Sequence, residues 1–272
     1  MALRIVVCAK EVLDPDAVNN YALEGKLVIG DDGKSLTQSS IPRLMNAYDE
    51  QAIEAALRIR EAGIACTITV VTVGEGSEIL KHAASLGVDE PVAIQADTGG
   101  LDHHGVAKLL AAFVRSRGGA DLLLCGRQAS DDDQGIVPAL LGEHLGFPVV
   151  TIARAVDVTA TGDAFGVRVV RVTPDGNETV AVAAPAVVTI SNELGQARYP
   201  TMAGRMAARK KKIATVTAAE LGVAAEALAP RVRLVKQFVP TVKGQCEIIG
   251  GATPAEAAAA LIARLRAEGV VR

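Results

Sequence analysis

Short apolar runs alternate with amphipathic segments over the first half of the chain. Residues 3–9 form an apolar run that only Arg4 interrupts, and residues 67–73 form a β-branched one that ends at Gly74, as buried strands do. Residues 46–62 lie between them and carry apolar side chains at helical spacing. Further strands are predicted at 90–95 and 121–125, and further helices at 78–86, 102–116 (capped by Asp102) and 136–145. This order predicts an α/β fold with a mostly parallel, Rossmann-like sheet.

The pattern changes after about residue 150. Residues 149–158, 165–173 and 179–183 are predicted to be extended, and the turn sequences TGDA and PDGN separate them, so the last two predict a β-hairpin. Residues 186–190 predict one more strand, whereas 191–212 show no period and predict a long loop. Thr253 as cap, Pro254 at the first position and Gly269 after the end predict a C-terminal helix. Since no low-complexity linker or repeat interrupts the chain, we expect one α/β domain with extensions.

Composition excludes several classes of protein. The 272 residues include 28 Lys and Arg against 31 Asp and Glu, a net charge of −3, which argues against a nucleic-acid binder. No run approaches the ~18 apolar residues of a membrane span, and the N-terminus lacks a secretory pattern. Four dispersed cysteines without a CxxC pair argue against a zinc site and favour a cytoplasmic location.

No catalytic or metal-binding apparatus is evident in the sequence. His103 and His104 are adjacent, so on a helix they point in different directions and do not form a metal site. No Ser/His/Asp or Cys/His arrangement can be placed, and neither GxxxxGK[ST] nor GxGxxG is present. We therefore expect a binding protein without catalytic residues or a metal.

The loop at residues 126–138 is the best candidate binding site. It follows a buried strand and opens a helix, which is where open parallel sheets bind ligands. Backbone N–H groups from Gln134 to Val137 are positioned to hold a phosphate, and Gly135 permits close approach. Alternatively, the aspartates of this loop are ordinary helix-terminal charges, and they repel an anion unless Arg127 or a neighbour offsets them.

A basic segment near residue 205 also has two interpretations. Its cations are Arg205, Arg209, Lys210, Lys211 and Lys212. They belong either to a solvated loop or to a functional one. Met202 and Met206 in the same segment either bind a partner or pack into a core.

Four stretches together resemble the β subunit of the electron-transfer flavoproteins. These are DLLLCGRQASDDD at 121–133, the segment 192–212 with ARYPTM and RKKK, IVVCAKEV at 5–12 and MNAYD at 45–49. They cover most of the chain in the family's order. The resemblance implies an electron carrier rather than an enzyme, which forms a heterodimer with an α subunit that holds most of the FAD. It also implies that the donors are acyl-CoA dehydrogenase-type flavoenzymes and that the acceptor is a quinone oxidoreductase.

By position, the resemblance also implies particular sites. A structural AMP would contact Cys8, Asn46, Ala47, Tyr48, Asp49, Val73, Asp131, Asp132, Asp133, Gln134, Gly135, Ile136 and Val137. A recognition loop at about 191–212 would dock the donor through Arg198, Tyr199, Thr201, Met202 and Met206. Residues 1–190 would then be the nucleotide-binding domain with its hairpin, and 191–272 the recognition loop and a C-terminal arm that packs on the partner subunit.

Departures from the family pattern define the alternatives. Gln134-Gly135-Ile136 replaces Asn-Gln-Thr or Thr-Ala-Gln of many relatives, and Pro15 stands where some have a flavin-contacting Tyr. A bifurcating branch binds a second FAD in place of AMP, but its Gly-Asp-Thr sequence is absent, so AMP is preferred. A stand-alone adenine-nucleotide sensor would need a late glycine-rich loop. A related ATP-dependent ligase or pyrophosphatase would need a Gly-Gly-x-Asp-Ser-like loop where Lys10-Glu11-Val12 stands.

Overall fold

The computed structural model describes residues 2–37, 39–240 and 246–271. It divides the chain into two compact units, Met1–Gln237 and Phe238–Arg272. The first contains the sheet and the second a C-terminal helix, and each is described by itself.

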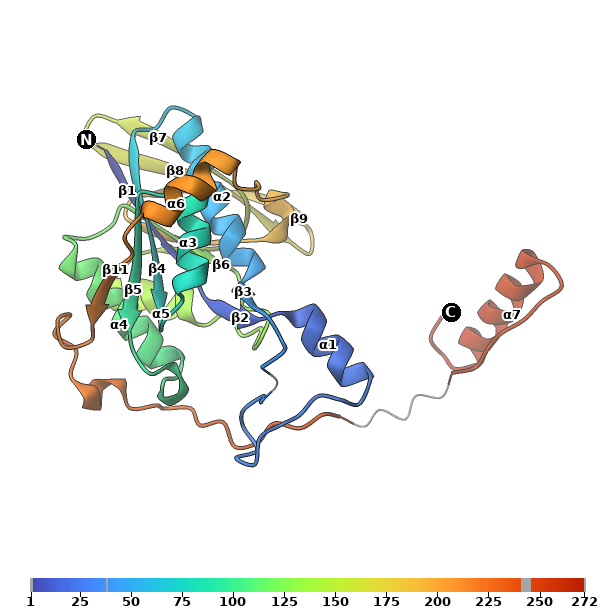
Figure 1. Cartoon of the computed structure of the whole chain (residues 1–272). Coiled ribbons are helices and arrows are strands. Elements are labelled where there is room, and N and C mark those ends of the chain that lie inside the picture. The colour runs from blue at the N-terminus through green and yellow to red at the C-terminus, as the bar shows by residue number, and fades with distance from the viewer. Residues whose placement is uncertain (1, 38, 241–245, 272) are drawn as a thin grey trace. The chain divides into compact units, whose positions relative to one another are not determined.

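In the described residues, a nine-stranded sheet forms the centre of the first unit, with the strand order β11-β5-β4-β1-β6-β10-β7-β8-β9 (Figure 1). All neighbours pair in parallel from β11 to β7, whereas β7–β8 and β8–β9 are antiparallel. The bounds are β1 Leu3–Cys8, β4 Cys66–Val73, β5 Glu90–Gln95, β6 Leu122–Gly126, β7 Val149–Thr161, β8 Ala164–Thr173, β9 Gly176–Ala183, β10 Ala186–Ile190 and β11 Ala214–Thr217. The mostly parallel α/β sheet with a hairpin extension is therefore confirmed.

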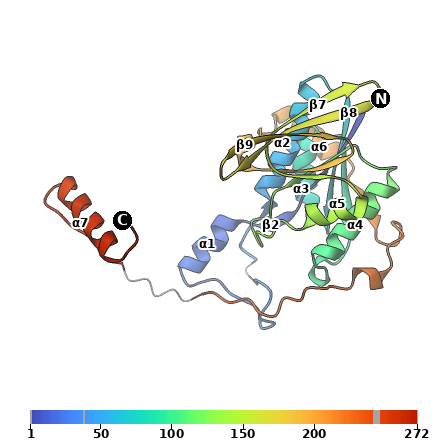
Figure 2. The same ribbon diagram turned by 180° about the vertical axis from the view of Figure 1, so that it is seen from behind.

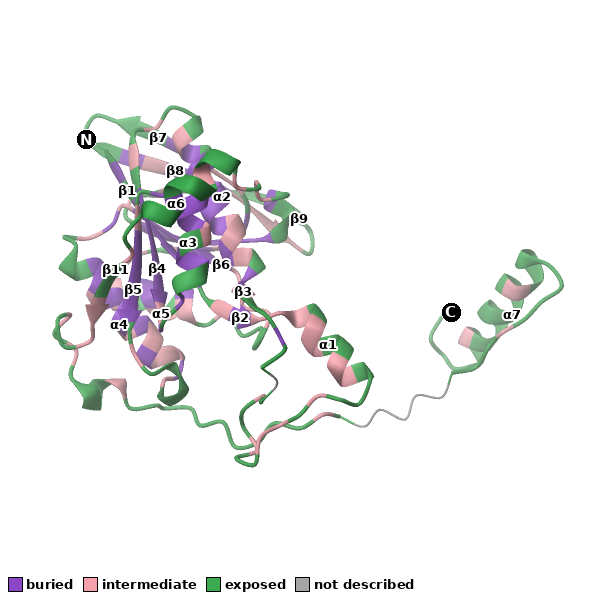
Figure 3. Ribbon diagram, in the orientation of Figure 1, coloured by how far each residue is buried: buried purple, intermediate pink, exposed green. Residues whose placement is uncertain are grey.

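Helices cover both faces of the parallel part of the sheet, as the views from front and back show (Figure 1, Figure 2). Leu3, Ile5 and Val7 of β1 pack in the core cluster of α2 (Ala47–Glu61) and α3 (Ser77–Leu86). The alternate residues Val6 and Cys8 pack with α4 (His103–Ser116) and α5 (Val137–Leu145). This two-sided burial explains why the parallel strands are largely apolar, and Figure 3 shows buried residues concentrated in them.

Several short elements were not predicted. α1 (Pro15–Leu23) is capped by Asp14, but none of its residues is buried, so no apolar stripe signals it. β2 (Glu11–Leu13) and β3 (Arg43–Met45) form a small antiparallel sheet. Three short 3₁₀ helices occur at Thr98–Gly100, Asn192–Leu194 and Ala225–Leu228. These elements are short or exposed, and local periodicity carries little information about them.

The prediction of a loop throughout residues 191–212 is wrong in its second half, where α6 spans Met202–Lys210. This helix packs against α3 through small residues: Ala208 is buried, and a Cβ on Gly204 would lie 2.3 Å from the Ser85 carbonyl oxygen. The larger apolar residues, Met202 and Met206, are exposed. Because the helix buries small residues and exposes methionines, its hydrophobic pattern does not identify the face that packs on the core.

The compact units divide between Gln237 and Phe238 and not at the functional boundary predicted after residue 190. β11 pairs with β5, and the side chains of Leu221, Val223 and Leu228 pack against the core cluster that contains α4. Residues 191–237 therefore belong structurally to the first unit. In the second unit, α7 (Pro254–Ala267) begins as predicted, with Thr253 accepting from the Glu256 N–H.

The chain order of the strands creates a switch point beside β1. After β1 the chain builds β4 and β5 on one side, and then crosses to form β6 on the other side of β1. Loops that leave the carboxyl ends of β1 and β6 consequently diverge, and this is where open α/β sheets form ligand crevices.

Asp49 holds this edge of the sheet together. Its buried carboxylate on α2 accepts hydrogen bonds from the backbone N–H groups of Lys10 and Gly126, both at 2.9 Å. A Cβ on Gly126 would lie 2.4 Å from the Asp49 carboxylate, so the contact requires glycine there. Burial raises the pKa of Asp49 to about 7, although the hydrogen bonds from Lys10, Asn46 and Gly126 lower it.

Asp49 is expected to make stability depend on pH. Between about pH 4 and pH 7 the folded chain keeps a proton on Asp49 that the unfolded chain has lost, so stability falls as pH rises. The contribution approaches about 1.4 kcal/mol per pH unit within that interval. The free energy of unfolding, measured with denaturant between about pH 4 and pH 7, should show this slope in the wild type. The Asp49→Asn variant should lack it. Asp157→Asn, which alters an exposed ion pair with Arg168, is the control. An identical pH slope in wild type and Asp49→Asn would refute the assignment.

Candidate functional site

A cavity of about 480 Å³ opens at the carboxyl ends of β1, β4 and β6. Its size falls within the ~300–1,000 Å³ range of small-molecule sites. It brings together many of the residues predicted for nucleotide contact, from four separate stretches of the chain. Those that line it are Cys8, Asn46, Asp49, Val73, Asp131, Asp132, Gly135, Ile136 and Val137.

The other predicted nucleotide residues lie beside this cavity and do not line it. Asp133 and Gln134 line a smaller cavity of about 250 Å³ that shares Gln128, Gly135 and Pro138 with the first. Ala47 and Tyr48 open helix α2, and the Tyr48 ring lies 5.6 Å from the Arg127 guanidinium carbon. Arg127 therefore stacks on an aromatic ring, which is a favourable cation–π arrangement.

Lys10 and His103 contact the acidic loop, and the sequence had not singled out either residue for this role. Lys10 Nζ lies 2.7 Å from Asp131 Oδ1 and 3.4 Å from Asp132 Oδ2, and His103 Nε2 lies 3.1 Å from Asp132. Burial raises the pKa of Asp132, but Lys10, the Gln134 N–H and His103 outweigh it, so the pKa lies below its usual value. The only local signal was the position of Lys10 directly after the first strand.

The residues at the start of α5 line the cavity and bring backbone N–H groups to it. Gly135 has a φ of +62°, and among the described residues no acceptor meets its N–H or that of Ile136. Ile136 occupies the N-cap position, and its side chain has no oxygen to cap the helix. Free N–H groups and the positive end of the helix dipole together favour an anion such as a phosphate.

Two buried polar residues fix the cavity walls. The Asn46 amide donates to the Gln128 carbonyl at 2.8 Å and accepts from the Ser130 N–H at 3.3 Å, so it holds the loop after β6. Asp102 caps α4 as predicted and also accepts from the N–H groups of Arg231 and Val232. Burial raises the pKa of Asp102, but the three N–H donors lower it to about 2 overall.

A second candidate surface lies on α6 and the segment before it. Tyr199, Met202 and Met206 are 79%, 74% and 61% exposed, so the alternative that these methionines pack into a core is wrong. Thr201 caps the helix by accepting from the Gly204 N–H at 3.0 Å. Lys211 donates to the Val88 carbonyl at 2.7 Å and so anchors the C-terminal end of the helix, whereas Arg205, Arg209 and Lys210 are exposed.

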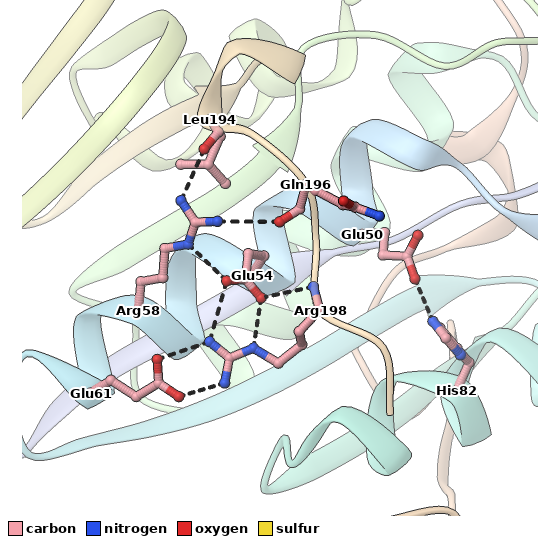
Figure 4. A network of polar contacts seen from close by, with 8 residues as sticks. All are labelled: Glu50, Glu54, Arg58, Glu61, His82, Leu194, Gln196 and Arg198. Carbon is pink, nitrogen blue, oxygen red and sulfur yellow. Dashed lines mark hydrogen bonds and ion pairs between the residues drawn. The ribbon is translucent and has the colours of Figure 1, made fainter. Parts of the chain in front are cut away.

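Arg198 differs from its predicted neighbours because its guanidinium points inward. It pairs with Glu54 and Glu61 of α2, within a network that includes Arg58 and the carbonyls of Leu194 and Gln196 (Figure 4). The hydrogen bond between His82 and Glu50 links α3 to α2 beside this network. Arg198 thus contributes to the support of the exposed surface.

In the described part of the chain, no group of three His, Cys, Asp or Glu residues is arranged to hold a metal ion. Nor is any helix there both long and apolar enough to cross a bilayer.

Comparison with known proteins relates this chain to one family. The model of the electron transfer flavoprotein domain matches residues 35–221. The electron transfer flavoprotein subunit beta of Syntrophomonas wolfei is 32% identical, over 89% of this chain and 88% of its own length. The corresponding Bacillus subtilis protein is also 32% identical, over 92% and 96%. CarD, a subunit of the caffeyl-CoA reductase–Etf complex of Acetobacterium woodii, is 30% identical over 99% and 100%.

The family-model match covers β4, β6, α2 and the exposed helix α6, and the match to the Acetobacterium woodii protein extends over 99% of the chain. They agree with the resemblance found in the sequence motifs. This chain belongs to the electron transfer flavoprotein family, as a homologue of its β subunits.

Proposed function

We propose that this chain is the β subunit of a heterodimeric electron-transfer flavoprotein and is not an enzyme with its own substrate. The α subunit would hold most of the FAD. Electrons would come from an acyl-CoA dehydrogenase-type flavoenzyme and pass to a quinone-linked acceptor. The observation that carries the proposal is that this family member has two features at different places. One is a cavity of nucleotide size, and the other is a helix with exposed apolar side chains. A carrier subunit needs both features, whereas the cavity alone would suit a sensor.

The cavity suits AMP as a structural ligand. Free N–H groups at Gly135 and Ile136 are available to a phosphate, and the salt bridges from Lys10 reduce the repulsion that Asp131 and Asp132 would exert on it. These two N–H groups are backbone donors, which agrees with the loop's departure from the family's side-chain pattern. The alternative ligand is a second FAD, and the similarity to a subunit of a reductase–Etf complex is the observation that supports this alternative.

The second compact unit, residues 238–272, would serve as the arm that packs on the α subunit. None of the α7 residues is buried within the chain, and Leu261 and Ile262 are exposed on it. Phe238 and Ile248 are also exposed before the helix. A partner that covers these apolar side chains would stabilise the arm. A cytoplasmic location is part of the proposal, supported by four cysteines that are all free thiols.

The nucleotide content of the purified chain tests the choice between AMP and FAD. We expect the chain, expressed without an α subunit, to be colourless and to release about one AMP per chain on denaturation, because its cavity suits a mononucleotide. Absorbance and mass spectrometry of the released material measure this. Release of stoichiometric FAD would establish the alternative, and release of neither nucleotide would remove the cavity's proposed role.

Gly135→Pro should abolish nucleotide retention. Proline cannot adopt the φ of +62° at this position, it removes the N–H that faces the cavity, and a Cβ there would lie 2.5 Å from the Arg127 carbonyl oxygen. We expect affinity for added AMP to fall by at least about tenfold in calorimetric titration. Gly162→Pro is a matched control, because Gly162 also has a φ of +62° but lies in the β7–β8 turn with no atom within 4 Å of a Cβ. Equal AMP binding by the two variants would show that the site is misplaced.

Met202→Ala should weaken docking of the donor dehydrogenase without unfolding the subunit. Truncation of an apolar anchor commonly costs about 2 kcal/mol or more, or about 30-fold in affinity. Donor-dependent flavin reduction by the heterodimer should show this loss, while melting temperature, flavin spectrum and AMP content stay unchanged. The buried Ile59→Ala should do the reverse, losing about 2–5 kcal/mol of stability with normal docking. A destabilised Met202→Ala heterodimer with normal donor affinity would contradict the docking assignment.

A further inference from the structure

Arg198 gives most of its hydrogen-bonding capacity to two carboxylates of α2. Its Nε lies 2.7 Å from Glu54 Oε2, and its Nη2 lies 3.2 Å from Glu54 Oε1 and 2.9 Å from Glu61 Oε2 (Figure 4). Nη1 also pairs with Glu61 Oε1, at 2.5 Å. The Glu54 side chain is only 6% exposed. Because these hydrogen bonds use most of its N–H donors, the guanidinium has few donors left to bind a protein partner.

The same part of α2 holds the backbone that precedes the docking helix. Arg58 reaches Glu54 through Nε at 2.7 Å and donates to the Leu194 carbonyl at 2.9 Å and the Gln196 carbonyl at 3.2 Å. The Arg198 N–H itself lies 3.3 Å from Glu54 Oε2. The buried Glu54 carboxylate therefore binds both Arg58 and Arg198. These contacts hold the backbone from Leu194 to Arg198 against α2.

This path determines where α6 begins. Thr201 caps the helix three residues after Arg198, and Met202 is its first residue. Further along, Gly204 touches the Ser85 carbonyl so closely that the helix has no room to move toward α3. The contacts before and within α6 together set the direction in which Met202 and Met206 face solvent.

Burial raises the pKa of Glu54, but the two arginines outweigh it and the pKa lies below its usual value. The hydrogen bonds to Glu61 and Glu54 raise the pKa of Arg198 above its usual value. The network therefore stays ionised at neutral pH. Removal of Arg198 leaves Glu54 paired with Arg58, so the loss is local and the buried carboxylate is not left alone.

We propose that Arg198 is a positioning residue, which acts through Glu54 to orient Met202 toward the donor dehydrogenase and does not itself contact the donor. This inference rests on the docking function proposed above. It predicts that the effects of mutating Arg198 and Met202 on donor binding are not additive, because Arg198 affects binding only by orienting Met202.

The test is a double-mutant cycle on the complete heterodimer, with the Michaelis constant for the donor dehydrogenase and kcat as readouts. Arg198→Met should raise the Michaelis constant by about tenfold and leave kcat unchanged, since chemistry is untouched once the partners are docked. In a chain that already carries Met202→Ala, Arg198→Met should add less than about twofold. Arg198→Lys should recover part of the loss, because an ammonium can reach only part of the two-carboxylate site.

Arg4→Met is the matched control. Arg4 forms a similar set of contacts, two to Asp121 and one to the Gly118 carbonyl, but touches neither the docking segment nor the cavity. It should lower the melting temperature with a normal Michaelis constant. The same result for Arg198→Met would make its role structural only and overturn the proposal, and additive effects of Arg198→Met and Met202→Ala would show direct contact with the donor and overturn it as well.

Amide hydrogen exchange of residues 199–206 separates this proposal from the docking function. Arg198→Met should speed exchange there while the rest of the chain keeps its wild-type protection. Unchanged exchange would refute positioning even if docking at Met202 holds. A normal Michaelis constant for Met202→Ala alone would instead refute the docking surface.

Discussion

Two buried carboxylates on helix α2 organise both candidate surfaces of this subunit. A carboxylate removed from water is costly unless donors surround it, so its position dictates which groups must approach. Asp49 accepts hydrogen bonds from backbone N–H groups at the ends of β1 and β6, and Glu54 forms ion pairs with Arg58 and Arg198. One helix thereby fixes the floor of the cavity and the start of α6.

The cavity shows how an acidic loop and an anion site can coexist. Lys10 crosses from the end of β1 to Asp131 and Asp132, and His103 reaches Asp132 from α4. With Asp131 and Asp132 paired to Lys10, the N–H groups of Gly135 and Ile136 are available to an anion. The wall is therefore built from backbone as much as from side chains, which leaves room for variation in the loop sequence.

Helix α6 buries small residues and exposes large ones. Gly204 and Ala208 allow α6 to lie close against α3, and Met202 and Met206 project into solvent beside exposed cations. Flexible thioether side chains on a rigid helix combine adaptable contact with low mobility of the backbone. This combination suits a carrier that must bind a partner, transfer an electron and dissociate.

The sequence alone was enough to predict the alternation of strands and helices, the caps at Asp102 and Thr253, the candidate loop after β6 and the family. These features depend on side-chain periodicity and on neighbours within a few residues, which the chain order contains directly. The sequence could not predict that Lys10 pairs with Asp131, 121 residues away, that Arg198 points inward or that the methionines of α6 point outward. The reason is that each of these contacts depends on which strand ends and helix faces lie next to each other in the folded chain. Residue spacing along the sequence does not specify which elements become neighbours.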